Sequence, residues 1–293
     1  QFLHVFRMPA FFVIAGFFAS YLLQTRGPNK FLRNRLQRIA LPLLLFWIPL
    51  VFANSWTSQG AWLTGRSTFD VLPIDFGHLW FLYFLILFCL VLWAFSSPLQ
   101  KLLIKRVSPH LFLLFLAAAL PLIPGVFDQE GTLATSTRIS PDPGLLLLYF
   151  LIFLSGALAY NQQELWLTFL RKRALWLFAV LLLSFTIFFV IQDWGLVGTR
   201  WIYAASVISG TYGVPGLFLR FATKQNKAFK FISDASYWLY LVHLPLVFFF
   251  LFSLGINGFG AIATILLTSV LTIVIGLVTY KVFVRHTFIS TLL

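Results

Sequence analysis

Residues His4 to Phe18 read HVFRMPAFFVIAGFF, an apolar run with a histidine and an arginine close to its start. The run lies within an apolar segment of residues 3–24, and about 20 such residues are what an α-helix needs to cross a bilayer. The whole chain has the same character: 60% of its 293 residues are hydrophobic, 10% are charged and the mean hydropathy is +0.92. A soluble domain carries about 25% charged residues. The sequence therefore predicts an all-α, polytopic membrane protein, since its apolar segments are too long for the roughly 10-residue strands of a membrane barrel.

Apolar segments of similar length recur along the chain, separated by short polar loops. We predict nine spans, over residues 3–24, 36–53, 77–95, 108–127, 144–160, 174–192, 201–219, 235–254 and 259–283. Pro42 and Pro49 lie within the second span and are expected to bend it.

The basic residues gather in alternate loops. Of the 21 lysines and arginines, all but Arg7, Arg66, Arg138 and Arg200 lie in or beside residues 25–38, 96–109, 161–173, 220–234 and the C-terminal tail. Such an excess marks the cytoplasmic side of a membrane protein. We therefore place the C-terminus in the cytoplasm and residue 1 outside, and we explain the net charge of +13 by topology and not by nucleic-acid binding. An outer residue 1 before nine spans leads us to expect at least one further span before it.

His4 and Arg7 are ionisable residues inside a predicted span, where such residues usually serve a function. They are three residues apart and so share a face of the helix near its outer end. The alternative is that Arg7 extends along the apolar surface to reach the membrane interface.

Asp75 and His78 form a second candidate pair, at the outer end of the third span. A carboxylate next to an imidazole can fix its tautomer and raise its basicity, as a general base requires. The alternative is an interfacial histidine beside Trp80, a tryptophan of the kind that lines membrane interfaces.

Ser236, Tyr240 and His243 have the spacing i, i+4, i+7, so they share one face of the eighth span. Tyr240, His243 and Trp80 are candidates for contacts to a substrate. A neutral histidine bonded to a tyrosine can also serve only to hold helices together.

Lys30, Arg33, Arg35 and Arg38 form a basic segment at the cytoplasmic surface. Arginine guanidinium groups suit phosphate binding. The excess of basic residues on the cytoplasmic side also explains these charges without any function. However, the apolar run begins at Ile39, directly after Arg38, so Arg38 lies deeper than that explanation requires.

Several catalytic motifs are missing from the sequence, among them Gly-x-Ser-x-Gly, His-Glu-x-x-His and a phosphate-binding glycine loop. The single cysteine, Cys89, lies in an apolar run that disfavours a thiolate, and the sequence has no metal-ligand spacing. We therefore expect no metal site and a direct transfer between two bound substrates.

Four motifs resemble those of one family. FRMPAFFVIAGFF resembles the signature Arg-x-Pro-x-Phe-Phe-x-x-(Ser/Ala)-Gly-Phe of the membrane acyltransferase-3 family, and RNRLQRIALP is similar to its Arg-x-x-Arg segment. HLWFL and SYWLYLVHLP resemble its later helices, in the same order. The runs HVFRMP and HLWFLYFL are most similar to the branch associated with succinylation of periplasmic glucans.

The resemblance implies a ten-span bundle in the bacterial inner membrane, of which residues 1–293 would be a single domain without its first helix. It implies transfer of a succinyl or acetyl group from cytoplasmic acyl-CoA, a co-substrate and not a bound cofactor, to a hydroxyl of a periplasmic or envelope glycan. Family members carry a catalytic histidine in that preceding helix, so either it or His78 would be the base. Lys30, Arg33, Arg35 and Arg38 would hold the CoA phosphates, and Arg7 would stabilise the oxyanion or bind a succinyl carboxylate.

Two other classes remain open from the sequence. A transporter or flippase for a glycan or lipid-linked sugar would fit the spans, although no acidic residue for ion coupling lies in the middle of a span. A scaffold subunit for envelope biosynthesis, without chemistry of its own, is the third class.

Overall fold

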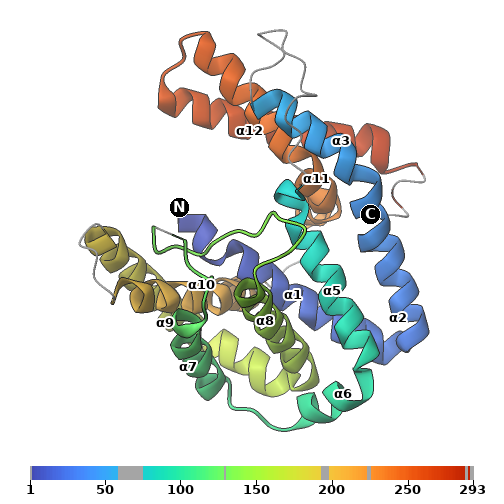
Figure 1. Ribbon diagram of the computed structural model, residues 1–293, viewed down its shortest axis with the longest axis vertical. Coiled ribbons are helices and arrows are strands. Elements are labelled where there is room, and N and C mark those ends of the chain that lie inside the picture. The colour runs from blue at the N-terminus through green and yellow to red at the C-terminus, as the bar shows by residue number, and fades with distance from the viewer. Residues whose placement is uncertain are drawn as a thin grey trace. The chain divides into compact units, whose positions relative to one another are not determined.

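A computed structural model of the protein describes residues 2–58, 75–128, 130–192, 198–222, 226–287 and 290 (Figure 1). Within these ranges every regular element is a helix, and β pairing is limited to two isolated bridges. Among the described residues, eight helices are long and apolar enough to cross a membrane: Phe2–Arg26, Pro28–Ser58, Gly77–Ala94, Pro143–Asn161, Gln163–Ile191, Thr199–Phe221, Phe229–Ile256 and Ala261–Val284. The prediction of an all-α, polytopic membrane protein is confirmed.

The predicted span 108–127 is shorter than expected. Helix α7 covers Pro109–Ala119 and tightens into a 3₁₀ turn, η4, at Leu120–Leu122. Ile123 is then extended, with φ −79° and ψ 120°, as a residue before proline prefers. Pro124 follows it, so the apolar run continues in sequence after the helix has ended.

The chain divides into two compact units. Unit 1 comprises residues 1–33, 84–136 and 140–224, and unit 2 comprises residues 34–83, 137–139 and 225–293. Each unit is described by itself.

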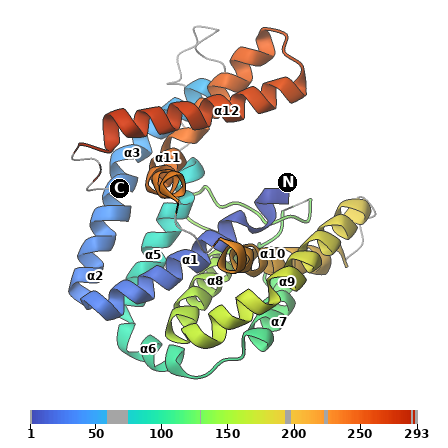
Figure 2. The same ribbon diagram turned by 180° about the vertical axis from the view of Figure 1, so that it is seen from behind.

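Unit 1 is built on two helix pairs. Helix α1 (Phe2–Arg26) packs against α8 (Pro143–Asn161), and α9 (Gln163–Ile191) packs against α10 (Thr199–Phe221), as both views show (Figure 2). Helix α6 (Ser96–Ile104) contacts α8 as well. Aromatic rings fill the core, where Phe12 lies 5.4 Å from Phe88 and 4.9 Å from Tyr149 between ring centroids.

The pair of α1 and α8 is in backbone contact at two glycines. A Cβ atom on Gly16 would overlap the carbonyl oxygen of Phe153, and one on Gly156 would overlap that of Val13. Small residues of this kind let membrane helices approach closely, which increases their van der Waals contact.

Unit 2 is built around α11 (Lys227–Ile256), which packs against α3 (Leu41–Ser58) and α12 (Ala261–Thr279). The π-helical turn η6 (Tyr280–Val284) continues α12, and the 3₁₀ turn η3 (Gly77–Leu79) leads into α5 (Trp80–Ala94), whose first residues belong to this unit. Helix α2 (Pro28–Arg35) joins α3 through a second π-helical turn, η1 (Leu36–Ala40).

The π-helical turn η1 lies directly before Leu41 and Pro42, and the Leu41 N–H donates to the carbonyl oxygen of Leu36. In an α-helix residue 42 would donate to the carbonyl of Arg38, but proline has no N–H. The hydroxyl of Tyr237 on α11 donates to that carbonyl instead, at 3.0 Å.

Candidate active site

His78 stands at the turn that starts α5. Gly77 has φ +49°, a conformation that favours glycine, and its backbone N–H donates to Oδ1 of Asp75 at 2.9 Å. The Asp75 carboxylate therefore shapes the turn that presents His78 to the rest of unit 2.

The predicted direct pairing of Asp75 with His78 is corrected by this geometry. The helix begins at Gly77 and does not extend back to Asp75, so the two side chains do not lie one helical turn apart. The ring of His78 is held by other groups: Nδ1 faces Nδ2 of Asn54 at 3.2 Å, and Nε2 faces the carbonyl oxygen of Leu241 at 3.0 Å.

The Leu241 carbonyl has a specific reason to accept from His78. In an α-helix it would accept from the N–H of residue 245, but Pro245 lies inside α11 and has none. Within a membrane a carbonyl without a donor is costly, because no water is present to replace it. His78 supplies the missing hydrogen from another segment of the chain.

Tyr240 and His243 join His78, as the predicted helix face required. The Tyr240 hydroxyl donates to the carbonyl of His78 at 2.6 Å, and Nδ1 of His243 donates to the carbonyl of Tyr240 at 2.7 Å. The His78 and His243 rings lie 5.3 Å apart between centroids, at 86°. We call Asn54, His78, Tyr240 and His243 the imidazole cluster. Ser236 points elsewhere, since its hydroxyl bonds to the carbonyl of Ser233.

A stack of aromatic rings supports the turn before His78. Phe76 is stacked on Tyr83 at 4.4 Å and lies 4.9 Å from Trp47, whose indole N–H donates to the carbonyl of Asp75. The segment 137–139 adds an isolated bridge between Arg138 and Asp75. Trp80, predicted as an interfacial or substrate-contacting residue, is buried with 5% of its surface exposed.

The basic segment is divided between the two units. Lys30 and Arg33 lie on α2 within unit 1 and are exposed. Arg35 ends α2 and is half-buried, and Arg38 is an exposed residue of η1, both within unit 2. Tyr237, which holds the Arg38 carbonyl, and Tyr240, which holds the His78 carbonyl, are one helical turn apart on α11.

His4 and Arg7 both lie on α1, as predicted, and both side chains are exposed. They belong to unit 1, whereas the imidazole cluster belongs to unit 2. The common helix face of His4 and Arg7 is therefore a feature of unit 1 alone.

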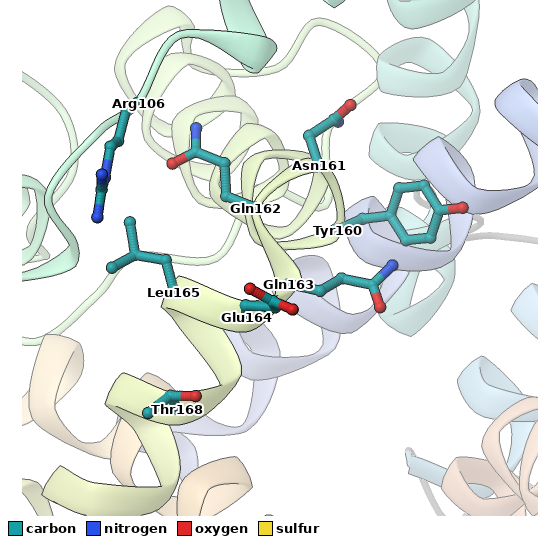
Figure 3. A pocket seen from close by; sticks show the side chains of 8 residues that line it. All are labelled: Arg106, Tyr160, Asn161, Gln162, Gln163, Glu164, Leu165 and Thr168. Carbon is teal, nitrogen blue, oxygen red and sulfur yellow. The ribbon is translucent and has the colours of Figure 1, made fainter.

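A polar pocket lies in unit 1, at the junction of α8 and α9. Its volume is about 800 Å³, and Figure 3 shows the side chains that line it: Arg106, Tyr160, Asn161, Gln162, Gln163, Glu164, Leu165 and Thr168. Gln162 fixes one wall, because its Nε2 donates to the carbonyl of Lys105 at 2.7 Å and its Oε1 accepts from the N–H of Val107 at 3.1 Å. The pocket carries one positive and one negative side chain and suits a polar ligand.

Sequence reasoning did not predict Asn54 and Tyr237. Asn54 is a single polar residue directly after the predicted end of the second span, and no motif or spacing in the sequence connects it with His78. Tyr237 precedes Tyr240 by three residues, and this i, i+3 spacing was the available signal. Among the described residues, no group of three or more His, Cys, Asp or Glu side chains is placed to hold a metal ion.

These observations define a class: a polytopic helical membrane protein in which two imidazoles, a tyrosine and an amide meet between apolar helices. A family model described as an acyltransferase domain, that of the acyltransferase-3 family, matches residues 1–281, and the chain belongs to this family. The resemblance seen in the four motifs is thereby confirmed, and the protein is a membrane acyltransferase.

Curated relatives share the similarity over most of the chain. The chain is 29% identical over 280 residues to proteins named Glucans biosynthesis protein C from Salmonella agona strain SL483, Salmonella dublin and Salmonella enteritidis PT4. The alignments cover 85% of this chain and 71% of each relative. No solved structure matches the chain.

Proposed function

We propose that the protein transfers a succinyl or acetyl group from cytoplasmic acyl-CoA to a hydroxyl of a periplasmic or cell-envelope glycan, in the bacterial inner membrane. The acyltransferase family and the name of the Salmonella relatives support this proposal. The strongest structural support is on α11, where the Tyr237 hydroxyl donates to the carbonyl of Arg38 in the basic segment and the Tyr240 hydroxyl donates to the carbonyl of His78 in the imidazole cluster. One helix thus connects the residues suited to an anionic donor with those suited to proton transfer.

The donor end of this proposal rests on Arg35 and Arg38, assisted by Lys30 and Arg33. Guanidinium groups bind phosphate with two parallel hydrogen bonds and keep their charge at any physiological pH. The CoA phosphates would be held at the cytoplasmic surface, with the thioester directed toward the imidazole cluster.

At the acceptor end, an imidazole removes the proton from the glycan hydroxyl while its oxygen attacks the thioester carbonyl. The new C–O bond forms, the C–S bond breaks, and the proton passes from the imidazole to the CoA thiolate. General base assistance of this kind contributes about 10²–10⁴-fold to the rate. In this proposal Arg7 stabilises the oxyanion or binds the carboxylate of a succinyl group.

The test uses the full-length protein in vesicles, with labelled succinyl-CoA or acetyl-CoA outside and a soluble glucan inside. We expect labelled glucan in the vesicle interior, and Arg7→Lys should slow its formation because the bidentate fork is lost. Unlabelled glucan that crosses the membrane without acylation would contradict the proposal in favour of a transporter. The absence of both acylation and transport would also contradict the proposal and would favour a scaffold.

Arg35→Ala and Arg38→Ala test the donor site in the same assay. Each removes a charge-assisted hydrogen bond worth about 1.5–3 kcal/mol, so the KM for acyl-CoA should rise by about 10- to 100-fold while the KM for glucan is unchanged. Arg171→Ala is the matched control, since Arg171 is an exposed arginine of another predicted cytoplasmic loop. Equal KM values for acyl-CoA in all three variants would remove the donor role.

A further inference from the structure

The pocket between the end of α8 and the start of α9 has no role in the proposed reaction, and its charged side chains have no partners. Arg106, from the loop before α7, and Glu164, from the first turn of α9, both line it and are both exposed (Figure 3). Within the described part of the chain, neither side chain forms an ion pair or a hydrogen bond, and the same holds for the side chains of Gln163 and Thr168. One pocket thus offers a cation, an anion and two neutral polar groups to a ligand.

The frame that carries the two charges is held by hydrogen bonds. Gln162 accepts from the backbone N–H of Val107 at 3.1 Å and donates to the carbonyl of Lys105 at 2.7 Å, so it binds the residues on either side of Arg106. Glu164 follows Gln162 by two residues. The loop with the cation is therefore tied to the turn with the anion, which reduces the ordering that binding of a ligand would require.

The pocket lies where lipid headgroups are found. Helices α8 and α9 are both long and apolar enough to cross a membrane, and the chain turns from one into the other at Gln162. Their junction is therefore at a membrane surface. The distribution of basic residues predicts that this surface is the cytoplasmic one.

One face of α9 leads from the pocket into the bilayer. Every seventh residue after Thr168 lies on nearly the same face of the helix. These residues are Leu175, Leu182 and Phe189, which are 50%, 44% and 57% exposed. At 1.5 Å per residue, Leu175 lies about 10 Å from Thr168, which is comparable with a headgroup layer roughly 5–7 Å thick. A lipid with its head in the pocket can therefore lay an acyl chain along this face.

The charges of the pocket select the type of head. A polyanion such as acyl-CoA would meet a single guanidinium, opposed by a carboxylate that repels it. A phosphoethanolamine head is a zwitterion, so its phosphate can pair with Arg106 while its ammonium pairs with Glu164. The ester oxygens of the glycerol can accept from the Gln163 amide and the Thr168 hydroxyl.

We propose that this pocket binds the head of a phospholipid that carries both a phosphate and a primary ammonium group, of which phosphatidylethanolamine is the simplest. Arg106 binds the phosphate, Glu164 binds the ammonium, and an acyl chain follows the exposed face of α9. The site lies within unit 1 and goes beyond the proposed reaction, on which it does not depend.

Native mass spectrometry of the full-length protein, titrated with defined lipids, tests the phosphate contact. Arg106→Ala should weaken binding of phosphatidylethanolamine by about tenfold, because a charge-assisted hydrogen bond is lost. Arg220→Ala is the matched control, since Arg220 is an exposed arginine of unit 1 outside the pocket. Equal affinities for this lipid in both variants would overturn the proposal.

Glu164→Gln tests the ammonium contact, because its effect should change sign with the lipid. The variant should bind phosphatidylethanolamine about threefold more weakly and phosphatidylglycerol, which has no ammonium, more tightly than the wild type does. Glu130→Gln removes the same charge from an exposed residue outside the pocket and should change neither affinity. A change of the same sign for both lipids in Glu164→Gln would contradict the zwitterion.

Two further measurements separate a lipid from other ligands. Soluble glycerophosphoethanolamine has the same head without acyl chains, and it should bind far more weakly than the lipid. Equal affinity would assign the pocket to a soluble phosphodiester and overturn the lipid. A higher KM for acyl-CoA in Arg106→Ala, with unchanged lipid binding, would assign the pocket to the donor and also overturn the proposal. Lipid binding needs no turnover, so a protein that transfers no acyl group would contradict the proposed function alone.

Discussion

Two prolines in the membrane-spanning helices each remove the donor for one carbonyl oxygen, and a side chain from another helix replaces it. Pro42 leaves the Arg38 carbonyl, which accepts from the Tyr237 hydroxyl. Pro245 leaves the Leu241 carbonyl, which accepts from the His78 ring. In lipid these replacements satisfy groups that water cannot reach. The same side chains therefore close gaps in the helices and fix the geometry of the candidate site.

Tyr237→Phe and Tyr240→Phe are expected to affect different substrates. Each removes one hydrogen bond, worth about 0.5–1.5 kcal/mol net, which corresponds to roughly 2- to 10-fold. Tyr237→Phe frees the Arg38 carbonyl and should raise the KM for acyl-CoA, whereas Tyr240→Phe loosens the hold on His78 and should lower kcat. Steady-state kinetics with both substrates measure the two effects, and each variant is the control for the other. Identical kinetic changes in both would show that the hydroxyls act only on stability.

His78→Leu and Pro245→Ala should compensate each other in stability. His78→Leu leaves the Leu241 carbonyl buried without a donor, at a cost of about 1–3 kcal/mol. Pro245→Ala restores an N–H at residue 245 that can donate to this carbonyl within α11. The double variant should therefore unfold at a higher temperature than His78→Leu alone, as thermal unfolding in detergent will measure. Additive losses of stability would mean that His78 and Pro245 are independent.

At the scale of elements, the contact between α1 and α8 depends on two glycines that face carbonyl oxygens. Gly16→Ala would press a methyl group onto the Phe153 carbonyl, and Gly156→Ala onto that of Val13. Backbone must move in either case, so each variant should lose about 1–3 kcal/mol, the usual cost of overpacking. Gly255→Ala in α11 is the matched control, because a Cβ there has no neighbour within 4 Å among the described residues. Thermal unfolding that is equally insensitive to all three would contradict this account.

The helices themselves follow from the sequence, because long apolar runs leave the backbone no alternative in lipid. The predicted span 108–127 is longer than the helix that forms. The prediction counted apolar residues and did not take account of the prolines at 121 and 124. The partner of His78 was also not predictable. Asp75 is its acidic neighbour in sequence, but a positive φ at Gly77 turns the chain and gives the carboxylate to the backbone.

Contacts between distant residues account for the rest of what sequence reasoning missed. Asn54 is 24 residues from His78, and Leu241 is 163 residues away. No periodicity connects them, because the contacts depend on how α3 and α11 pack. The spacing of Tyr240 and His243 did predict a shared face, since a single helix determines it. Positions within one element were thus predictable, and pairings between elements were not.

At the scale of the whole molecule, the distribution of charge predicts which loops face the cytoplasm. All but four of the 21 lysines and arginines lie in or beside one set of loops. Moving one such charge across a membrane potential of 100 mV costs about 2.3 kcal/mol, so the side with many basic residues stays inside. Residues 96–109 should therefore be cytoplasmic, and residues 128–143 should face the periplasm.

The single cysteine makes this orientation measurable. Cys89 is buried with 1% of its surface exposed, and in a Cys89→Ala background the exposed serines Ser97 and Ser140 offer a matched pair of labelling sites. A membrane-impermeant maleimide added to intact spheroplasts should label S140C and not S97C. After permeabilisation both should react, which shows that S97C was shielded by the bilayer and not by the fold. Labelling of S97C in intact spheroplasts would reverse the orientation, and the basic segment from Lys30 to Arg38 would then face away from the cytoplasmic pool of acyl-CoA on which the proposed reaction depends.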